Sequence, residues 1–360
     1  MQKEIFKNLK VIDLSTVLAG PSVGTFFAEL GAKVVKVEHP THPDVTRSWK
    51  LPGESKEASV SAYFSSINFA KDYISLDLTN NEHHKVLQGL LQDADLVIMN
   101  FKKGGQDKLN ISDKALHEIN PKLIIGKISG FGENSDRVAY DLILQAESGF
   151  MSMNGTPNSG PVKIPLALID VLAAHHLKEG LLIELISREK EQKKYKGGVI
   201  CVSLYDAAVS SLINQASNYL MTGRIPQRIG SLHPNIAPYG ELFKTKDGKT
   251  ITFAIGSDRH FVKLCSFLNI EDAIKDERFS STQLRVKNRN ELQEIISKSV
   301  NTLNADEILN GLNSIFVPCG EVKDLKAVFN DQKAQDLIRK ETIDGIETKR
   351  VSTIAFKKTT

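Results

Sequence analysis

Short apolar runs that alternate with helix-like stretches constrain the fold of this chain more than any other feature. Residues 11–14 (VIDL) are typical of a buried strand, and residues 34–38 (VVKVE) are typical of a second one. Between them, residues 23–30 are typical of a short helix that ends at Gly31. Two strands joined through a helix predict a βαβ unit, and such units build parallel sheets with right-handed crossovers. The pattern therefore predicts an α/β fold.

The same alternation continues along the next part of the chain. Further strands are expected at residues 73–78, 95–99, 123–129 and 199–204. Further helices are expected at residues 81–93, 111–119, 141–150, 171–186 and 205–221. Residues 187–198, rich in lysine and glutamate, are expected to form a solvated connector.

The pattern changes after residue 225, and this change predicts a second domain. An irregular loop with three prolines, at residues 226–239, precedes a more mixed region. In that region a strand is expected at residues 249–255, with helices at 261–268, 289–300 and 305–315. A length of 360 residues exceeds what one ordinary core fills, which also favours two domains.

These observations give predicted domain boundaries. We expect a large domain at residues 1–198, completed by a C-terminal segment at 328–360 that contains a helix and a strand at 351–356. Residues 199–224 form the linking strand and helix, and residues 225–327 form a small α+β domain.

Composition excludes several classes of protein. The formal net charge of +3 argues against nucleic acid as the main partner, although it leaves room for a local phosphate-binding site. Three cysteines without a CxxC pair support neither a disulfide framework nor a zinc site, so a reducing compartment and a cytoplasmic location are expected. No apolar stretch is long enough to cross a membrane, and the charged N-terminus does not resemble a signal peptide.

Asp170 is the candidate functional residue. It is the only charged residue between positions 164 and 174, and burying a carboxylate among apolar neighbours is costly unless it is held or used. One explanation is an N-cap, because Asp170 directly precedes the expected helix at 171–186 and aspartate is a favoured capping residue. The other is a catalytic carboxylate at a helix start, open to a cleft. The two explanations are compatible.

Two other motifs point to weaker alternatives. The opening βαβ unit, with Glu38 at the end of its second strand, invites a dinucleotide site and hence an NAD-dependent oxidoreductase. However, residues 18–24 (LAGPSVG) do not match G-x-G-x-x-G, and Pro21 lacks the N–H that a phosphate cradle needs. His175 and His176 are adjacent on a helix, so they do not share a face, and no metal site is expected.

Basic residues recur near the ends of the predicted strands, where open α/β sheets bind ligands. These residues are His39, Arg47, Lys71, Lys102, Lys103 and Lys108. Together they could hold a polyanionic ligand through charge-assisted hydrogen bonds. For Lys102 and Lys103 alone, ordinary decoration of a surface loop is the favoured explanation.

Taken together, the motifs resemble those of the class III CoA-transferase family, the CaiB/BaiF group that includes the formyl-CoA transferases. The similar segments run through nearly the whole chain in order: VIDLSTVLAGP, ELGAKVVKVEHP, DVTRSW, INFAKDYISLDL, ADLVIMNF, YDLILQAESGFMSMNGTP, PLALIDVLAA, SLYDAA, HPNIAPY, GSDRHF and VPCGEV. The resemblance implies a Rossmann-like large domain plus a small α+β domain, and a homodimer of two interlocked rings.

The resemblance also implies a set of site residues. Asp170 stands at the position of the family's nucleophile. The positions that match the CoA contacts of the family are Val17, Leu18, Ala19, His39, Leu76, Thr79, Asn100, Phe101, Lys102, Lys108, Ser129, Gly130 and Phe131. At position 39 some members have arginine, so a phosphate contact by histidine would depend on pH.

The expected function is transfer of CoA from an acyl-CoA to a carboxylic acid, through an acyl-aspartyl anhydride and an aspartyl-CoA thioester on Asp170. CoA is then a substrate, and no permanently bound cofactor is expected. The nucleophile must be ionised, so a low pKa is expected, with the helix amides after Asp170 favouring the charged form. A loop at residues 230–239 is a candidate lid against water. Succinate is a reasonable acceptor, with Arg47 or Arg224 pairing its second carboxylate.

An α-methylacyl-CoA racemase is the nearest alternative, because it shares the fold and the CoA site. That chemistry needs an acid and a base across the α-carbon, and racemases carry a histidine directly before an aspartate. Tyr140 stands directly before Asp141 in this chain, so racemization is disfavoured. A non-catalytic CoA-binding relative is a further alternative, made less attractive because Asp170 is retained.

Overall fold

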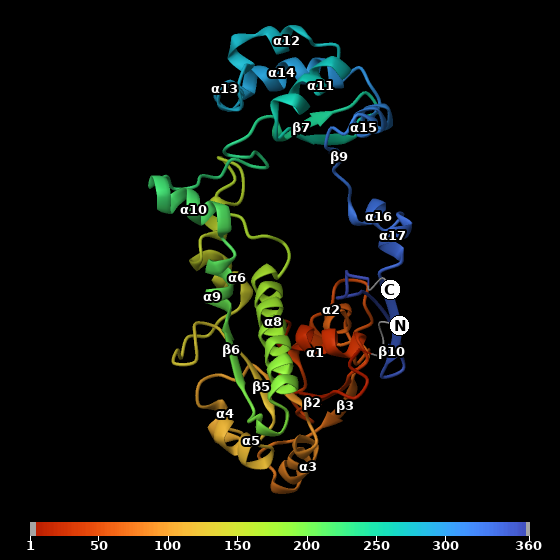
Figure 1. Ribbon diagram of the computed structural model, residues 1–360. Coiled ribbons are helices and arrows are strands. Elements are labelled where there is room, and N and C mark those ends of the chain that lie inside the picture. The colour runs from red at the N-terminus through yellow and green to blue at the C-terminus, as the bar shows by residue number, and fades with distance from the viewer. Residues whose placement is uncertain (1–4, 358–360) are drawn as a thin grey trace. The chain divides into compact units, whose positions relative to one another are not determined.

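The computed structural model describes residues 5–357, which form two compact units (Figure 1). The large unit comprises the chain up to residue 150, residues 163–224 and the chain from residue 335 onward. The small unit comprises residues 151–162 and 225–334. The small unit thus takes in residues 151–162, which the sequence assigned to the large domain; the predicted domain boundaries themselves stay a prediction.

The large unit is built on a six-stranded parallel sheet with the order β3-β2-β1-β4-β5-β6. Its strands are β1 (Lys10–Asp13), β2 (Lys33–Glu38), β3 (Asp72–Ser75), β4 (Leu96–Met99), β5 (Ile124–Ser129) and β6 (Val199–Ser203). The strand order reverses between β1 and β4, so this doubly wound sheet has its switch point there. The prediction of a parallel α/β fold is confirmed.

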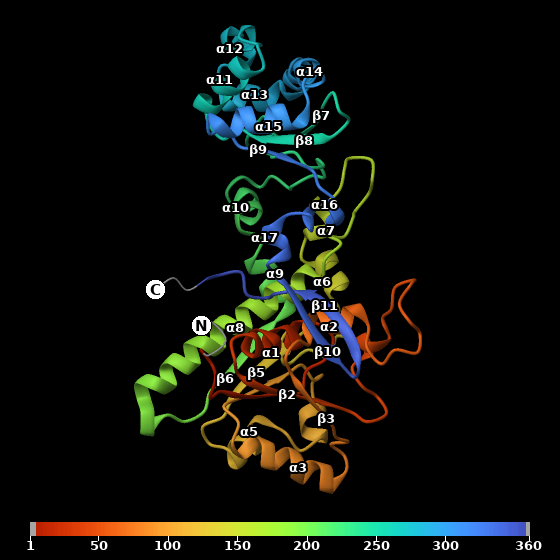
Figure 2. The same ribbon diagram turned by 90° about the vertical axis from the view of Figure 1, so that its right-hand side faces the viewer.

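Helices cover both faces of this sheet (Figures 1 and 2). On one face, α1 (Ala19–Glu29) and α8 (Leu168–Glu191) share an apolar core with strand residues such as Leu96. On the other face, α3 (Asn81–Gln92) and α5 (Asp113–Ile119) pack against the alternate strand residues. Because both faces are buried, β4 is apolar at every position, which is why the strand was readable from sequence.

The start of α1 differs from the prediction. The helix was expected to begin at residue 23, but it begins at Ala19, and Pro21 lies in its first turn, where proline is tolerated. Gly20 and Gly24 serve close packing: a Cβ at Gly20 would overlap the side chain of Ser15, and one at Gly24 would lie 2.9 Å from Asp13 Oδ2. The glycines that resemble a broken dinucleotide fingerprint therefore let α1 approach the end of β1.

The long helix α8 also begins earlier than predicted. Ala167 is its N-cap residue and Asp170 is its third residue, so the interpretation of Asp170 as an N-cap is wrong. The helix runs on to Glu191, which makes about half of the expected solvated connector helical. The helix expected at 205–221 is two helices, α9 (Leu204–Ser210) and α10 (Ile213–Thr222).

The C-terminal segment forms an antiparallel hairpin of β10 (Ile338–Ile343) and β11 (Ile346–Val351), which packs on α2 (Ala62–Ile67). A buried ion pair between Arg350 and Glu29 ties this hairpin to α1. The strand expected at 351–356 is wrong, because β11 ends at Val351.

The small unit has its own core and a three-stranded antiparallel sheet in the order β7-β8-β9. Its strands are β7 (Tyr239–Lys244), β8 (Thr250–Ala254) and β9 (Cys319–Glu321). Its main helices are α11 (Asp258–Phe267), α12 (Asp272–Lys275), α13 (Thr282–Lys287), α14 (Arg289–Val300) and α15 (Ala305–Ser314). Five other short helices are α4 (Gly105–Lys108) and α6 (Asp141–Glu147), which belong to the large unit, together with α7 (Phe150–Met153), α16 (Leu325–Val328) and α17 (Gln332–Gln335). Within residues 5–357, no helix combines the length and the apolar composition needed to cross a membrane.

Candidate active site

A cavity of about 480 Å³ lies in the large unit at the switch point of the sheet. The segment after β1, residues 16–19, lines it together with residues 100–104 after β4 and residues 129–130 at the end of β5. Asp170 from the first turn of α8 also lines it. Ligands of open α/β sheets bind at this place, outside the carboxyl ends of the strands, so the topology alone marks the cavity as a candidate site.

The Asp170 side chain is buried in the wall of this cavity. The residue is only 9% exposed, and within residues 5–357 no hydrogen-bond donor is directed at its carboxylate. Asp141, at the start of α6, is its charged neighbour. Asp141 is fixed in place because its Oδ1 accepts from the Ile169 N–H at 2.7 Å and its Oδ2 accepts from Gln145 Nε2 at 2.6 Å.

Burial raises the pKa of Asp170 to about 7, and the negative charge of Asp141 adds to this effect. The expectation of a low pKa for Asp170 is therefore wrong. The expected support from the helix terminus is missing because the Ile169 N–H donates to Asp141, while the Val171 N–H donates to the Ala167 carbonyl within the helix. Asp170 therefore bears the free-energy cost of desolvation and lies near a like charge. Near pH 7 its carboxyl group is only partly ionised.

The structure brings many of the predicted CoA contacts to this one cavity with Asp170. The residues that line it are Val17, Leu18, Ala19, Asn100, Phe101, Lys102, Ser129 and Gly130. Five others lie outside its lining. His39 lines a second, more open cavity, Leu76 is buried in the core, Thr79 and Lys108 are exposed, and Phe131 packs on Tyr205. All these contacts stay predictions.

The cations around the cavity differ in how they are held. Lys127 is paired with Asp113 at 2.6 Å and with Glu133, and Lys103 lies 3.6 Å from Asp136. Arg137 pairs with Glu147 at 2.6 Å and stacks on the ring of Phe131 at 3.8 Å. Among the described residues, none is a partner for the Lys102 ammonium group, which leaves it available to an anionic ligand.

Sequence reasoning missed one group that acts on Asp170, which is Asp141, and one group on which the charge of Asp170 acts, which is Tyr63. Asp141 was noted only in the comparison with racemases, although its spacing to Gln145 places both side chains on one helix face. Tyr63 in α2 carried no sequence signal. Burial raises the pKa of Tyr63 to about 12, and the charges of Asp170 and Asp141 contribute, so its phenol stays protonated. Its ring meets that of Trp49 edge-on at 5.1 Å between centroids.

Arg47 does not fit the suggested role as a partner for a substrate carboxylate. Its Nε and Nη2 atoms donate to Glu38 at 3.0 and 2.6 Å, and its Nη1 donates to the Ser59 carbonyl and to Asp344. The guanidinium is therefore committed within the protein. Arg224 is exposed. No cluster of metal-ligating side chains occurs in the part of the chain that the structure describes.

A doubly wound sheet with an unpartnered carboxylate at its switch point defines an α/β enzyme whose ligand binds at the strand ends. Comparison with known proteins gives the family: the chain belongs to CoA-transferase family III, whose model matches residues 6–357. The family that the sequence motifs suggested is thereby confirmed.

Relatives and a solved structure agree with this assignment. A succinate–glutarate CoA-transferase of Agrobacterium fabrum is 36% identical over 343 residues, which cover 93% of this chain and 84% of the relative. A human succinyl-CoA:glutarate CoA-transferase is 31% identical, over 90% of this chain and 73% of the relative. The crystal structure of a CaiB/BaiF family protein from Brucella suis is 35% identical and aligns with a TM-score of 0.82, over 99% of this chain and 93% of the other. The prediction that this chain is a CoA-transferase is confirmed.

Proposed function

We propose that this enzyme moves CoA from an acyl-CoA to a carboxylic acid by covalent catalysis at Asp170. The observation that carries the proposal is the Asp170 carboxylate, which lines the switch-point cavity and receives no hydrogen bond from residues 5–357. A carboxylate without hydrogen-bond donors is poorly stabilised, and it is therefore a better nucleophile than a solvated one.

The donor half-reaction has two steps. The Asp170 carboxylate attacks the thioester carbonyl of the donor, which forms a mixed anhydride and releases CoA as a thiolate. The thiolate then attacks the aspartyl carbonyl of the anhydride, which forms an aspartyl-CoA thioester and releases the donor acid as its carboxylate. Each intermediate keeps an activated acyl group, so the energy of the thioester is not lost to water.

The acceptor half-reaction runs the same steps in reverse. The acceptor carboxylate attacks the aspartyl-CoA carbonyl, which gives a second anhydride and the CoA thiolate. The thiolate attacks the acceptor carbonyl of this anhydride, so the new acyl-CoA forms and Asp170 returns as a carboxylate. No metal ion, and no cofactor other than CoA itself, is needed to balance either half-reaction.

Dicarboxylates of four or five carbons are the proposed substrates. The support is that two relatives at 36% and 31% identity are named as transferases of succinate and glutarate. Lys102, at the cavity and without a partner among the described residues, is suited to a phosphate of CoA. The other predicted contacts are proposed to bind CoA together with it.

The direct test is an assay with succinyl-CoA and glutarate, in which acyl-CoA products are separated by chromatography. Formation of glutaryl-CoA with release of an equal amount of succinate is expected. Hydrolysis of succinyl-CoA without glutaryl-CoA would contradict the proposal. Exchange of an α-proton of a 2-methylacyl-CoA with solvent would instead favour the racemase alternative, and binding of NAD would favour the oxidoreductase.

The rate should depend on pH through Asp170. Because the ionised carboxylate is the nucleophile and burial raises its pKa to about 7, we expect kcat/KM to rise between pH 5 and 8 and then to level. Asp141→Asn removes the neighbouring charge, so the rising limb should move to lower pH in that variant. Initial rates across the pH range measure both effects. A midpoint that does not move in Asp141→Asn would refute the coupling between the two carboxylates.

We propose in addition that the enzyme works as an interlocked homodimer. In α10 no residue is buried, and Ile213, Leu220 and Met221 are 72%, 78% and 86% exposed. Ile213 and Leu220, seven positions apart, lie on one helix face, and Met221 extends the exposed apolar surface beside them; so large an apolar surface is unusual on a monomer. Light scattering coupled to gel filtration should give twice the chain mass of 39.8 kDa. A monomer at micromolar concentration that keeps full activity would refute the proposal.

A further inference from the structure

Residues 15–17 lie in the loop that joins β1 to α1. The backbone of these residues is held by hydrogen bonds to side chains of other elements. The Thr16 N–H donates to Asn100 Oδ1 at 3.0 Å, and Asn100 Nδ2 donates to the Thr16 carbonyl at 2.8 Å. The Ser15 N–H donates to Asp13, and the Ser15 carbonyl accepts from Lys36 Nζ at 2.7 Å. We call residues 15–17 the switch loop, because they lie where the strand order reverses.

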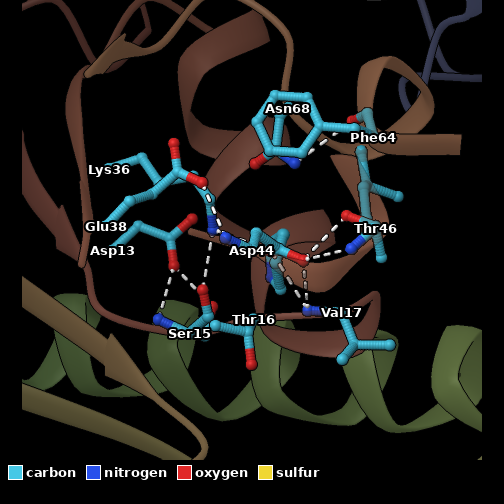
Figure 3. Close-up of polar contacts among 12 residues, drawn as sticks. Asp13, Ser15, Thr16, Val17, Lys36, Glu38, Asp44, Thr46, Phe64 and Asn68 are labelled. Carbon is cyan, nitrogen blue, oxygen red and sulfur yellow. Dashed lines mark hydrogen bonds and ion pairs between the residues drawn. The ribbon is translucent and has the colours of Figure 1, made fainter. Parts of the chain in front are cut away.

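The last contact of the switch loop comes from Asp44 (Figure 3). The Val17 N–H donates to Asp44 Oδ2 at 3.2 Å. Each backbone N–H and carbonyl from the Ser15 N–H to the Val17 N–H is thus paired, and none of the pairs belongs to a helix or a sheet.

The conformation of this loop is strained at Val17, whose φ is +72°. A β-branched residue rarely adopts a left-handed backbone, and holding one there costs free energy. Such a conformation persists only when the surroundings enforce it. The strained residue itself lines the cavity that contains Asp170.

Buried charged side chains enforce the left-handed conformation of Val17. The side chains of Lys36 and Asp44 are fully buried and lie 3.3 Å apart, and Asp13 forms a second fully buried pair with Lys71 at 2.8 Å. A buried ion pair is weak evidence for stability, because apolar residues of similar volume often stabilise a fold equally well or better. A role other than stability is therefore the better explanation of the Lys36–Asp44 pair.

Asp44 is itself held in its orientation by hydrogen bonds with neighbouring residues, as Figure 3 shows. Its N–H donates to Glu38 Oε1 at 2.9 Å, and its Oδ1 accepts from the N–H and the hydroxyl of Thr46 at 3.0 and 2.7 Å. These bonds leave Oδ2 for Lys36 and Val17. One carboxylate thus couples β2, through Lys36, to the loop that follows β1.

We propose that Asp44 and Lys36 are positioning residues that hold the switch loop in its strained form, so that the following residues present the CoA-binding wall of the cavity. This inference rests on the proposed function, because it takes CoA as the ligand of that wall. The pair acts through the backbone of residues 15–17 and does not line the cavity itself.

The test compares two double variants that each remove one buried ion pair. Lys36→Met/Asp44→Ala removes the pair that holds the switch loop and leaves no stranded charge. Glu29→Ala/Arg350→Met removes the buried pair between α1 and β11, which does not touch that loop, and serves as the matched control. Binding of CoA is measured by calorimetry, and KM and kcat with succinyl-CoA as donor. Backbone hydrogen exchange is followed in a peptide that spans residues 14–20.

The loop variant should raise the Kd for CoA and the KM for succinyl-CoA by about ten- to a hundred-fold, and exchange at residues 14–20 should quicken. The control should lose stability but keep CoA affinity within about two-fold of wild type. Adding Val17→Gly to the loop variant should recover part of the affinity, because glycine adopts a positive φ without strain. If this double variant does not fold, Lys36→Met/Asp44→Asn, which also leaves no unpaired charge and keeps one acceptor oxygen at position 44, should show a smaller loss in the same direction.

Two results would overturn the inference: equal CoA affinity in the wild type and the loop variant, or the same loss of affinity in the loop variant and the control. Absence of CoA binding in the wild type is a different result, because it would overturn the proposed function itself.

Discussion

Asp170→Ala should lower the rate of CoA transfer by about 10⁴-fold or more, because neither the anhydride nor the aspartyl thioester can form without this carboxylate. Burial among apolar groups and the charge of Asp141 raise its pKa, so its removal should not harm the fold. CoA affinity should stay close to that of the wild type, since the residues proposed to bind CoA are unchanged. The rates with succinyl-CoA and glutarate, and the Kd for CoA, measure the two quantities.

Asp272→Ala is the matched control for this variant. Asp272 is an exposed acid in the first turn of α12 and is absent from the lining of the cavity, so the same chemical deletion there should leave the rate unchanged. An Asp170→Ala enzyme that keeps more than about a tenth of wild-type activity would contradict the assignment of the nucleophile.

Arg285→Ala should destabilise the small unit by about 2–5 kcal/mol. The Arg285 side chain is fully buried, and its guanidinium donates to the carbonyls of Ala237 and Phe279 at 3.2 and 2.9 Å and to Asp258. Its removal leaves buried carbonyls without a donor and a cavity beside Phe261, over which it stacks at 4.6 Å. Hydrogen exchange of the β8 amides, measured in the native enzyme, reports the stability of this unit directly.

Arg278→Ala is the comparison for this prediction. Arg278 pairs with Asp276 at 2.7 Å, but its side chain is 53% exposed, so its loss should cost about 1 kcal/mol or less. If both arginine variants speed exchange in β8 by the same factor, burial of Arg285 is not what makes it important.

Arg285 also bears on the predicted lid. Its bond to Ala237, together with bonds from Arg289 to the carbonyls of His233 and Ile236, holds the loop of residues 230–239 by its backbone. A segment clamped at several carbonyls moves as part of the unit that carries it. The closure of this loop over Asp170, which the sequence suggested, stays a prediction.

The parallel sheet was predictable because both of its faces are covered. Residues 96–99 read as a strand from their unbroken apolar character, which follows from burial on both sides. The C-terminal hairpin was missed because its strands are highly charged and half-buried. Its turn at Asp344 and Gly345 between alternating strands was a usable signal, since this dipeptide favours two-residue hairpin loops.

The site was predictable only in part, because its electrostatics arise from tertiary contacts. The isolated charge of Asp170 in an apolar stretch was visible in the sequence, and it correctly identified a residue that lines the cavity. Its raised pKa was not visible, since that depends first on burial in the folded protein and then on Asp141, 29 positions earlier in the chain, which also takes the helix amide that could have stabilised Asp170.

The Lys36–Asp44 pair, which is proposed to hold the switch loop, could not be predicted from the sequence either. Lys36 lies within a strand where the pattern gives no reason to expect a buried charge, and its partner Asp44 lies in a loop.

The most direct measurement of the central claim is to trap the aspartyl intermediate. The enzyme is incubated with succinyl-CoA, quenched with borohydride or hydroxylamine, digested, and examined by peptide mass spectrometry. The account predicts homoserine or a hydroxamate at Asp170, in the wild type and not in Asp170→Ala. A modification at another carboxylate, or an unmodified Asp170 in enzyme that is turning over, would contradict it.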